Sequence, residues 1–199
     1  MRSDAPISLE TRALGTLDYI RTSIDASCSL VVPGTAGVLT GSIGLAAGAL
    51  AAAAPSHWLA IWLIACAAAF VVGAIVMTRQ ARQSGHARYL GPLRKFLLCL
   101  CPALLAGAVL TLVLWHAGVE HLLPGTWLLL YGCAVLSAST VTVASTRGLI
   151  VVMGVLFVAL GCIAYALPAA GQVAILGLGF GLLHLLVGLK IARITANER

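Results

Sequence analysis

Charged residues are scarce in this sequence of 199 residues. Asp, Glu, Lys and Arg together make up 9% of it, whereas about 25% is usual in soluble domains. Because 61% of the residues are hydrophobic, too few polar side chains remain to cover a globular surface in water. The composition therefore excludes a soluble globular protein and favours one that is embedded in a bilayer.

The sequence also lacks the motifs that identify common enzymes. It contains no P-loop, no dinucleotide-binding glycine fingerprint and no nucleophile elbow. Its cysteines lie mostly inside apolar stretches and no two form a CxxC motif, so they do not indicate a disulfide framework or a redox site. We therefore expect a protein that is not an enzyme and that has no cofactor.

What the chain does have is a series of uncharged apolar stretches, each close to the length of about 20 residues that crosses a bilayer as a helix. Most of the links between them are short, which favours antiparallel neighbours. We predict an all-α membrane protein, a bundle of six transmembrane helices arranged as three hairpins that turn at Pro55, Pro124 and Pro168. The six stretches span residues 29–54, 58–77, 96–117, 127–145, 149–167 and 173–189.

The basic residues predict how the bundle is oriented. If the N-terminus is cytoplasmic, all 12 Lys and Arg residues lie on the cytoplasmic side and Glu120 is the only charged residue outside. We therefore predict a multi-pass protein with both termini in the cytoplasm. The segment from Arg79 to Lys95 carries five of these cations and is suited to contact anionic lipid headgroups. Nucleic acid is not expected as a partner, because no soluble basic module is present.

The polar segment 1–28 is expected to stay on the cytoplasmic side. Leu9, Ala13, Leu17, Ile20 and Ile24 recur at steps of three and four, which predicts an amphipathic helix at the membrane interface. Docking of a partner protein is the alternative role for this helix. The acidic residues near the start do not fit a cleavable signal peptide. The domain organisation we predict is thus this segment, a transmembrane domain over 29–193 and a short tail over 194–199.

Glycine is the strongest packing signal. The first apolar stretch has glycines at alternating steps of three and four, and the last repeats the pattern. Small residues let membrane helices approach closely, so these stripes predict helix contacts, within the chain or in a homodimer. The expected packing residues are Gly34, Gly37, Gly41, Gly44, Gly48, Gly177, Gly181 and Gly188.

His184 is the one ionisable residue expected deep in the membrane, and such residues are candidates for function. Its spacing from Gly181 and Gly188 places it against a neighbouring helix rather than lipid. We consider a hydrogen-bonded structural imidazole first, and a proton relay or a haem ligand as alternatives. The fourth stretch offers hydroxyl partners, which are equally able to bond back to their own helix: Ser137, Ser139, Thr140, Thr142 and Ser145.

A second group of polar residues is expected on the outer face. His57, His116, Glu120 and His121 are candidate metal ligands. Only His116 and Glu120 share a helix face, however, and the spacing matches no known zinc motif. Histidines beside Trp58 are also typical of an ordinary interfacial belt.

Four segments of the sequence carry a family resemblance: PGTAGVLTG in the first stretch, Arg94-Lys95-Phe96 leading to Pro102 and Ala106-Gly107, LPGTWLLLYG at 123–132, and GFGLLHLLVGLKIAR at 179–193. In these segments the chain resembles an uncharacterised bacterial family of six-span proteins. The resemblance implies a bacterial source, the inner membrane and no established activity, with His184 in the family pattern GFGxxH.

Three classes of function remain open at this point. The first is a non-enzymatic structural, sensory or regulatory membrane component, which needs no further chemistry. The second is a small transporter or channel whose pathway runs near His184 and the polar fourth stretch. The third is a haem- or metal-binding membrane protein.

Overall fold

The computed structural model describes residues 16–17, 29–83 and 86–197 of the chain. Six of its helical spans are long and apolar enough to cross a membrane, so the predicted all-α class and the presence of six apolar helices of spanning length are confirmed. The amphipathic helix predicted within 1–28 lies outside the described residues, except for Thr16 and Leu17. The spans are α2 (Gly34–Ala53), α3 (Trp58–Gln83), α4 (His86–His116), α5 (Leu123–Ser139), α6 (Ala144–Tyr165) and a last span made of α7 (Ala169–Leu176), η3 (Gly177–Leu183) and α8 (His184–Asn197).

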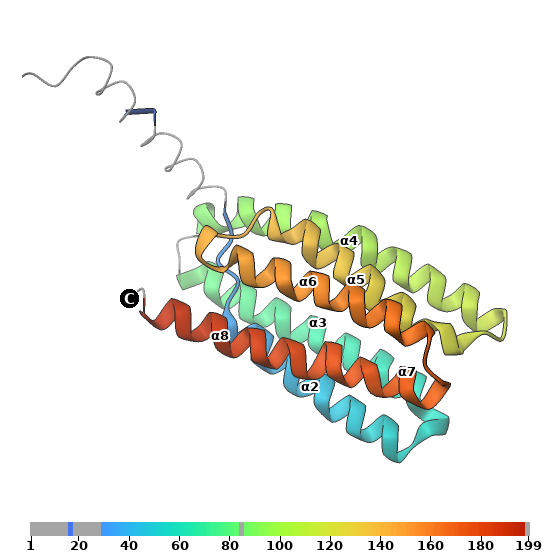
Figure 1. The fold of residues 1–199 in the computed structure, drawn as a ribbon. Helices are drawn as coiled ribbons and strands as arrows, with labels where there is room; N and C mark the ends of the chain where they lie inside the picture. Colours follow the sequence, from blue (N-terminus) through green and yellow to red (C-terminus); the bar gives the residue numbers. More distant parts are fainter. Residues whose placement is uncertain (1–15, 18–28, 84–85, 198–199) are drawn as a thin grey trace, which may run out of the picture.

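Proline marks three of the helix starts at one end of the bundle. Pro55 opens the short helical turn η1 (Pro55–His57) before α3, Pro124 lies in the first turn of α5, and Pro168 caps α7. Proline suits these positions because its ring fixes a helical φ and the N–H that it lacks would have no partner. Figure 1 shows that the links preceding α3, α5 and α7 all lie at this end, while the α5–α6 link and the C-terminal end of α8 lie at the other.

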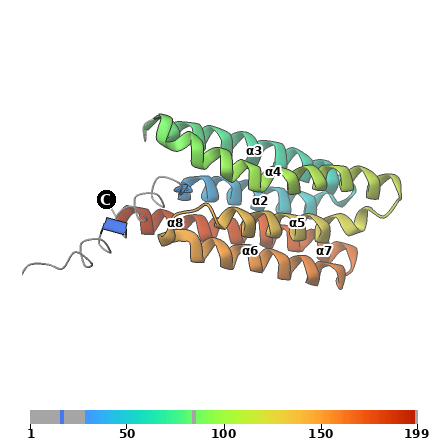
Figure 2. The same ribbon diagram turned by 90° about the horizontal axis from the view of Figure 1, so that it is seen from above.

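The helices do not all pack closely with their neighbours in sequence. The closest packing joins α5 to α6, α2 to α8, α4 to α5 and α2 to α3, whereas α3 and α4 make few contacts with each other. The first and last spans therefore lie side by side, which closes the bundle (Figure 2). α3 and α4 have few buried residues, so most of their apolar surface is available to lipid.

The core lies between α5, α6 and the last span. Leu128, Phe157 and Leu176 are fully buried there, and Ala47 and Ala51 of α2 and Trp62 of α3 belong to the same cluster. These buried side chains come from five of the six spans. α4 contributes instead through Thr111, whose hydroxyl accepts a 2.9 Å hydrogen bond from Trp127 Nε1 of α5.

Glycines bring the backbones of α2 and the last span into direct contact. A Cβ added at Gly188 would lie 2.5 Å from Val38 N, and one added at Gly41 would lie 2.5 Å from Leu185 N. Gly44 lies against the Phe180 carbonyl in the same way. Any side chain at these positions would force the two helices apart, so glycine is required for this approach. We call this α2 contact with the last span the glycine seam.

The segment before α2 is anchored to the link between α5 and α6. Leu30 N–H donates to Val141 O at 2.7 Å, and Val143 N–H donates to Leu30 O at 3.2 Å. The Leu30 side chain is buried, and Arg147 Nη2 donates to Thr142 O within the same link at 3.0 Å. This parallel bridge satisfies backbone groups that have no helical partner.

The glycine seam predicts a large difference between two glycine substitutions. Gly188→Ala should lower the free energy of unfolding by about 1–3 kcal/mol, because its Cβ meets the α2 backbone rather than a flexible side chain. Gly73→Ala on α3 is the matched control, since a Cβ there has nothing within 4 Å. Thermal unfolding in mild detergent measures both. Equal stability of the two variants would contradict the role of the seam.

Candidate functional site

His184 is the buried polar residue around which the candidate site is built. It is the first residue of α8, and its side chain lies in the core. Nε2 is 2.7 Å from the Tyr131 hydroxyl of α5, and Nδ1 is 3.4 Å from the Gly179 carbonyl. Both ring nitrogens therefore have partners within the protein, which a histidine needs when it is buried away from water.

A π-helical segment places the imidazole. η3 widens the last span over Gly177–Leu183, immediately before His184. The Gly179 carbonyl that meets the side-chain Nδ1 belongs to this segment and lies five residues before His184. A Cβ on Gly179 would lie 2.6 Å from a Leu128 methyl and 3.1 Å from the Phe157 ring. The side chains of Leu128 and Phe157 therefore pack directly against the backbone of the widened turn at Gly179.

Aromatic rings enclose the imidazole. The ring centroids of Tyr131 and Phe157 lie 5.3 and 5.2 Å from that of His184. Phe180 stacks on it at 6.1 Å with an interplanar angle of 17°, and Trp62 of α3 lies 6.1 Å beyond Phe180. We call these five residues the aromatic cluster. Trp62 Nε1 is buried within it without a hydrogen-bond partner in the described part of the chain.

The fourth span supplies the partner of His184, but not from its hydroxyl-rich end. Ser139, Thr140 and Thr142 donate to carbonyls of their own segment at 2.6–2.7 Å. Ser137 is exposed, and Ser145 is exposed on α6, beyond the end of α5 at Ser139. Tyr131, at the middle of α5, makes the bond instead. The sequence predicts Ser and Thr hydroxyls as partners, whereas His184 bonds the longer side chain of Tyr131, which reaches between helices.

The imidazole also lies beside the glycine seam rather than within it. The His184 carbonyl, not its ring, is near Gly37 of α2, and the ring turns toward α5 and α6. A regular α-helix places positions 181, 184 and 188 on one face. The π turn that ends just before His184 changes this alignment, so the glycines face α2 while the imidazole faces the core.

The outer-face residues do not come together as a metal site. Among the described residues, no three His, Cys, Asp or Glu side chains are grouped so that they could hold a metal ion. His57 Nδ1 lies 3.0 Å from Ser56 Oγ, and the His116 ring lies 5.2 Å from that of Trp115. Glu120 and His121 form the turn η2 (Glu120–Leu122). The predicted ligand set His57, His116, Glu120 and His121 therefore gains no support from the geometry.

The arrangement at His184 is suited to holding helices together. Its ring nitrogens bond protein groups, and rings from α5, α6 and η3 occupy the space around it. A haem iron or a metal ion would need one nitrogen free and an open position beside it. The residues present do not provide that space.

Comparison of the chain with known protein families, curated proteins and solved structures finds no match. The resemblance to a bacterial six-span family therefore stays a prediction.

A double-mutant cycle tests whether Tyr131 and His184 stabilise the bundle as a pair. We expect Tyr131→Phe and His184→Phe each to destabilise the protein, with a coupling energy of about 0.6–1.7 kcal/mol, as measured for hydrogen bonds between membrane helices. The measurement is reversible unfolding in bicelles by titration with a denaturing detergent.

Tyr165→Phe is the control for this cycle. It also removes a tyrosine hydroxyl, but one whose 2.8 Å contact with Thr126 Oγ1 is exposed. Its effect should be smaller than that of Tyr131→Phe. A coupling energy of zero between Tyr131 and His184 would show that their contact contributes nothing to stability.

Proposed function

We propose that this protein is a non-enzymatic component of the bacterial inner membrane with a structural, sensory or regulatory role. In this proposal the six spans form a closed bundle of three hairpins, and function resides at the ends of the bundle rather than in a reaction or a pathway within it. The observation that carries the proposal is the enclosure of His184. It is buried in the core, and both of its ring nitrogens and the ring itself contact other residues of the described chain.

The packing around His184 supports this conclusion. Tyr131 and Gly179 take both ring nitrogens, and Phe157 and Phe180 cover the ring. On the other side of the last span, the glycine seam brings two backbones into contact. An ion pathway needs a continuous hydrated route, and tight packing on both sides of the span works against one.

The distribution of charge supports the proposed orientation. The described basic residues lie in four segments that share one end of the bundle (Figure 1): the ends of α3 and α8 and the starts of α4 and α6. Glu120 lies in the link before α5, at the opposite end. Basic residues near helix ends stay in the cytoplasm, so we propose that the basic end and both termini are cytoplasmic.

A small transporter is the second candidate, and one observation favours it. π-helical turns often occur at functional sites, and η3 ends directly at His184. A bundle that opened at this turn would expose the imidazole to a proton pathway. The proposals differ in what they require of His184: a pathway needs it to change partners, whereas a structural bond needs it to keep them.

One preparation tests the three classes together. We expect purified wild-type protein to have no Soret band and no stoichiometric metal. Reconstituted in liposomes, it should conduct no more protons than empty liposomes do. A Soret band or bound metal that His184→Ala removes would make this a cofactor protein, and proton flux that the same variant abolishes would establish the transporter. His121→Ala is the matched control, because it removes an outer-face histidine instead.

Reporter fusions test the orientation. Green fluorescent protein at the C-terminus should fluoresce, because it folds in the cytoplasm, and alkaline phosphatase fused after Val119 should be active, because that link is expected outside. A dark C-terminal fusion together with an inactive phosphatase fusion would reverse the proposed topology.

A further inference from the structure

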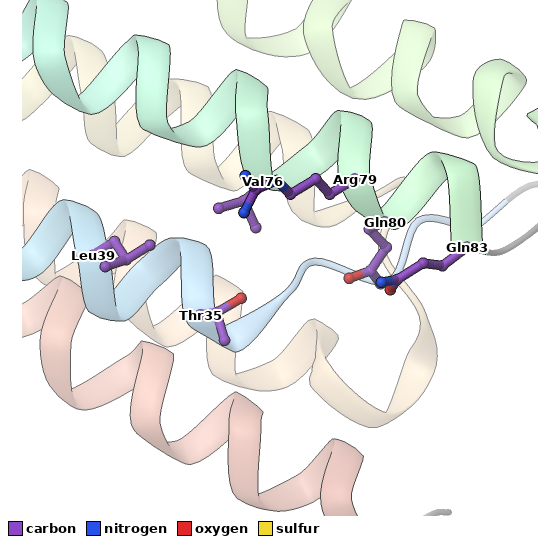
Figure 3. Close-up of a pocket in the computed structure, with 6 residues that line it drawn as sticks. All are labelled: Thr35, Leu39, Val76, Arg79, Gln80 and Gln83. Atoms are coloured by element: carbon purple, nitrogen blue, oxygen red, sulfur yellow. The ribbon is translucent and has the colours of Figure 1, made fainter.

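A hollow of about 260 Å³ lies between α2 and α3 at the basic end of the bundle. Figure 3 shows the Arg79 side chain running along α3 toward Val76, and the Thr35 hydroxyl turned from α2 toward α3. Gln80 and Gln83 continue the wall toward the end of α3. The lining residues are Thr35, Leu39, Val76, Arg79, Gln80 and Gln83.

The lining changes from apolar to polar along the direction of the spans. Leu39 lies one turn deeper in α2 than Thr35, and Val76 lies one turn deeper in α3 than Gln80. By position along the helices, Leu39 and Val76 lie toward the membrane interior and Thr35, Gln80 and Gln83 toward the surface. The Arg79 side chain reaches back toward Val76 (Figure 3). An amphiphile with a polar head and an apolar chain matches this order, whereas a small soluble ion would use only its outer part.

The charge of Arg79 has no acidic partner among the residues that the structure describes. Arg79 has no hydrogen-bond or ion-pair partner within the described ranges, and Glu120, the only acidic residue described, belongs to the opposite end. Thr35, in the first turn of α2, lines the same hollow as Arg79, so the positive end of the α2 dipole lies on the same side of the bundle as the guanidinium. The two glutamine amides supply further donors. This set of groups favours phosphate, which accepts several hydrogen bonds and carries negative charge.

We propose that this hollow binds the phosphate headgroup of an anionic phospholipid, with Arg79 as the main contact and the start of an acyl chain beside Leu39. Basic pockets between transmembrane helices bind anionic headgroups in this manner. The inference rests on the proposed placement of this end of the bundle at the membrane surface. The sequence predicts lipid contact along the whole segment from Arg79 to Lys95, and the hollow assigns it to one pocket between α2 and α3.

Lipid retention measured by native mass spectrometry tests the site. The full chain is purified from liposomes that contain equal amounts of phosphatidylglycerol and phosphatidylethanolamine. We expect wild type to retain phosphatidylglycerol preferentially and Arg79→Gln to retain about five- to tenfold less, the value of one charged contact near a membrane surface. Arg82→Gln is the matched control, because it removes the same charge one turn along α3, outside the hollow.

A second variant separates the pocket from the general charge of this end. Val76→Trp keeps every charge but fills the hollow, and it should reduce retention of the anionic lipid as Arg79→Gln does. Thermal unfolding of each variant shows whether it still folds; Arg79→Met, which also removes the charge but keeps a long side chain, replaces Arg79→Gln if that variant does not, and Val76→Phe replaces Val76→Trp.

Three results would overturn the proposal. Equal losses in Arg79→Gln and Arg82→Gln would reduce the effect to surface charge, and equal retention of the two lipids by wild type would exclude headgroup selection. Displacement of the lipid by excess inorganic phosphate would assign the hollow to a soluble anion. The test of orientation with the reporter fusions and the test of lipid binding have separate outcomes. A reversed topology would change which leaflet supplies the lipid, but not whether Arg79 and Val76 affect its retention.

Discussion

The backbone contact between the first and last spans is the interaction on which the rest of the bundle depends. Lipid tails are as apolar as leucine, so the spans gain little from hydrophobic burial against each other and must instead pack closely. The glycine seam achieves this where Gly188 and Gly41 leave no room for a Cβ. It closes the bundle by joining the two ends of the chain, while the consecutive helices α3 and α4 stay only loosely associated.

The polar centre follows from the same contact. Once the last span is held against α2 on one side, its other side must accommodate α5 and α6. The π turn η3 and Gly179 make that possible, because the wider turn sends the next side chain toward the core and the missing Cβ admits Leu128 and Phe157. The imidazole of His184 then meets Tyr131 rather than lipid. A buried polar pair of this kind fixes which helices are neighbours, since a wrong neighbour would leave both groups unpaired.

The sequence is sufficient to predict the spans, because a bilayer penalises charge at every position of a crossing helix. The limits of α2, Gly34–Ala53, fall within the apolar stretch 29–54. The last span continues to Asn197, beyond the predicted 189, because Lys190 and Arg193 extend the helix into the interface. The partner of His184 was not predictable in this way. Nothing in the local sequence distinguishes Tyr131 from the five Ser and Thr hydroxyls nearby. Which of them meets His184 depends on the π turn η3, and the glycines of GLGFG allow such a turn but do not predict it. The bridge from Leu30 to the α5–α6 link likewise joins residues more than 100 positions apart, which no periodicity reveals.

The seam between α2 and the last span also constrains how the chain is made. Ribosomes synthesise α2 first among these six spans and its partner last, so the glycine face of α2 meets lipid or the insertion machinery throughout the intervening synthesis. Contacts between such distant segments cost loop-closure entropy and form late. Final assembly therefore waits for the end of translation, and a chain interrupted before its last span would expose a smooth glycine surface that a neighbouring protein's helix is free to occupy.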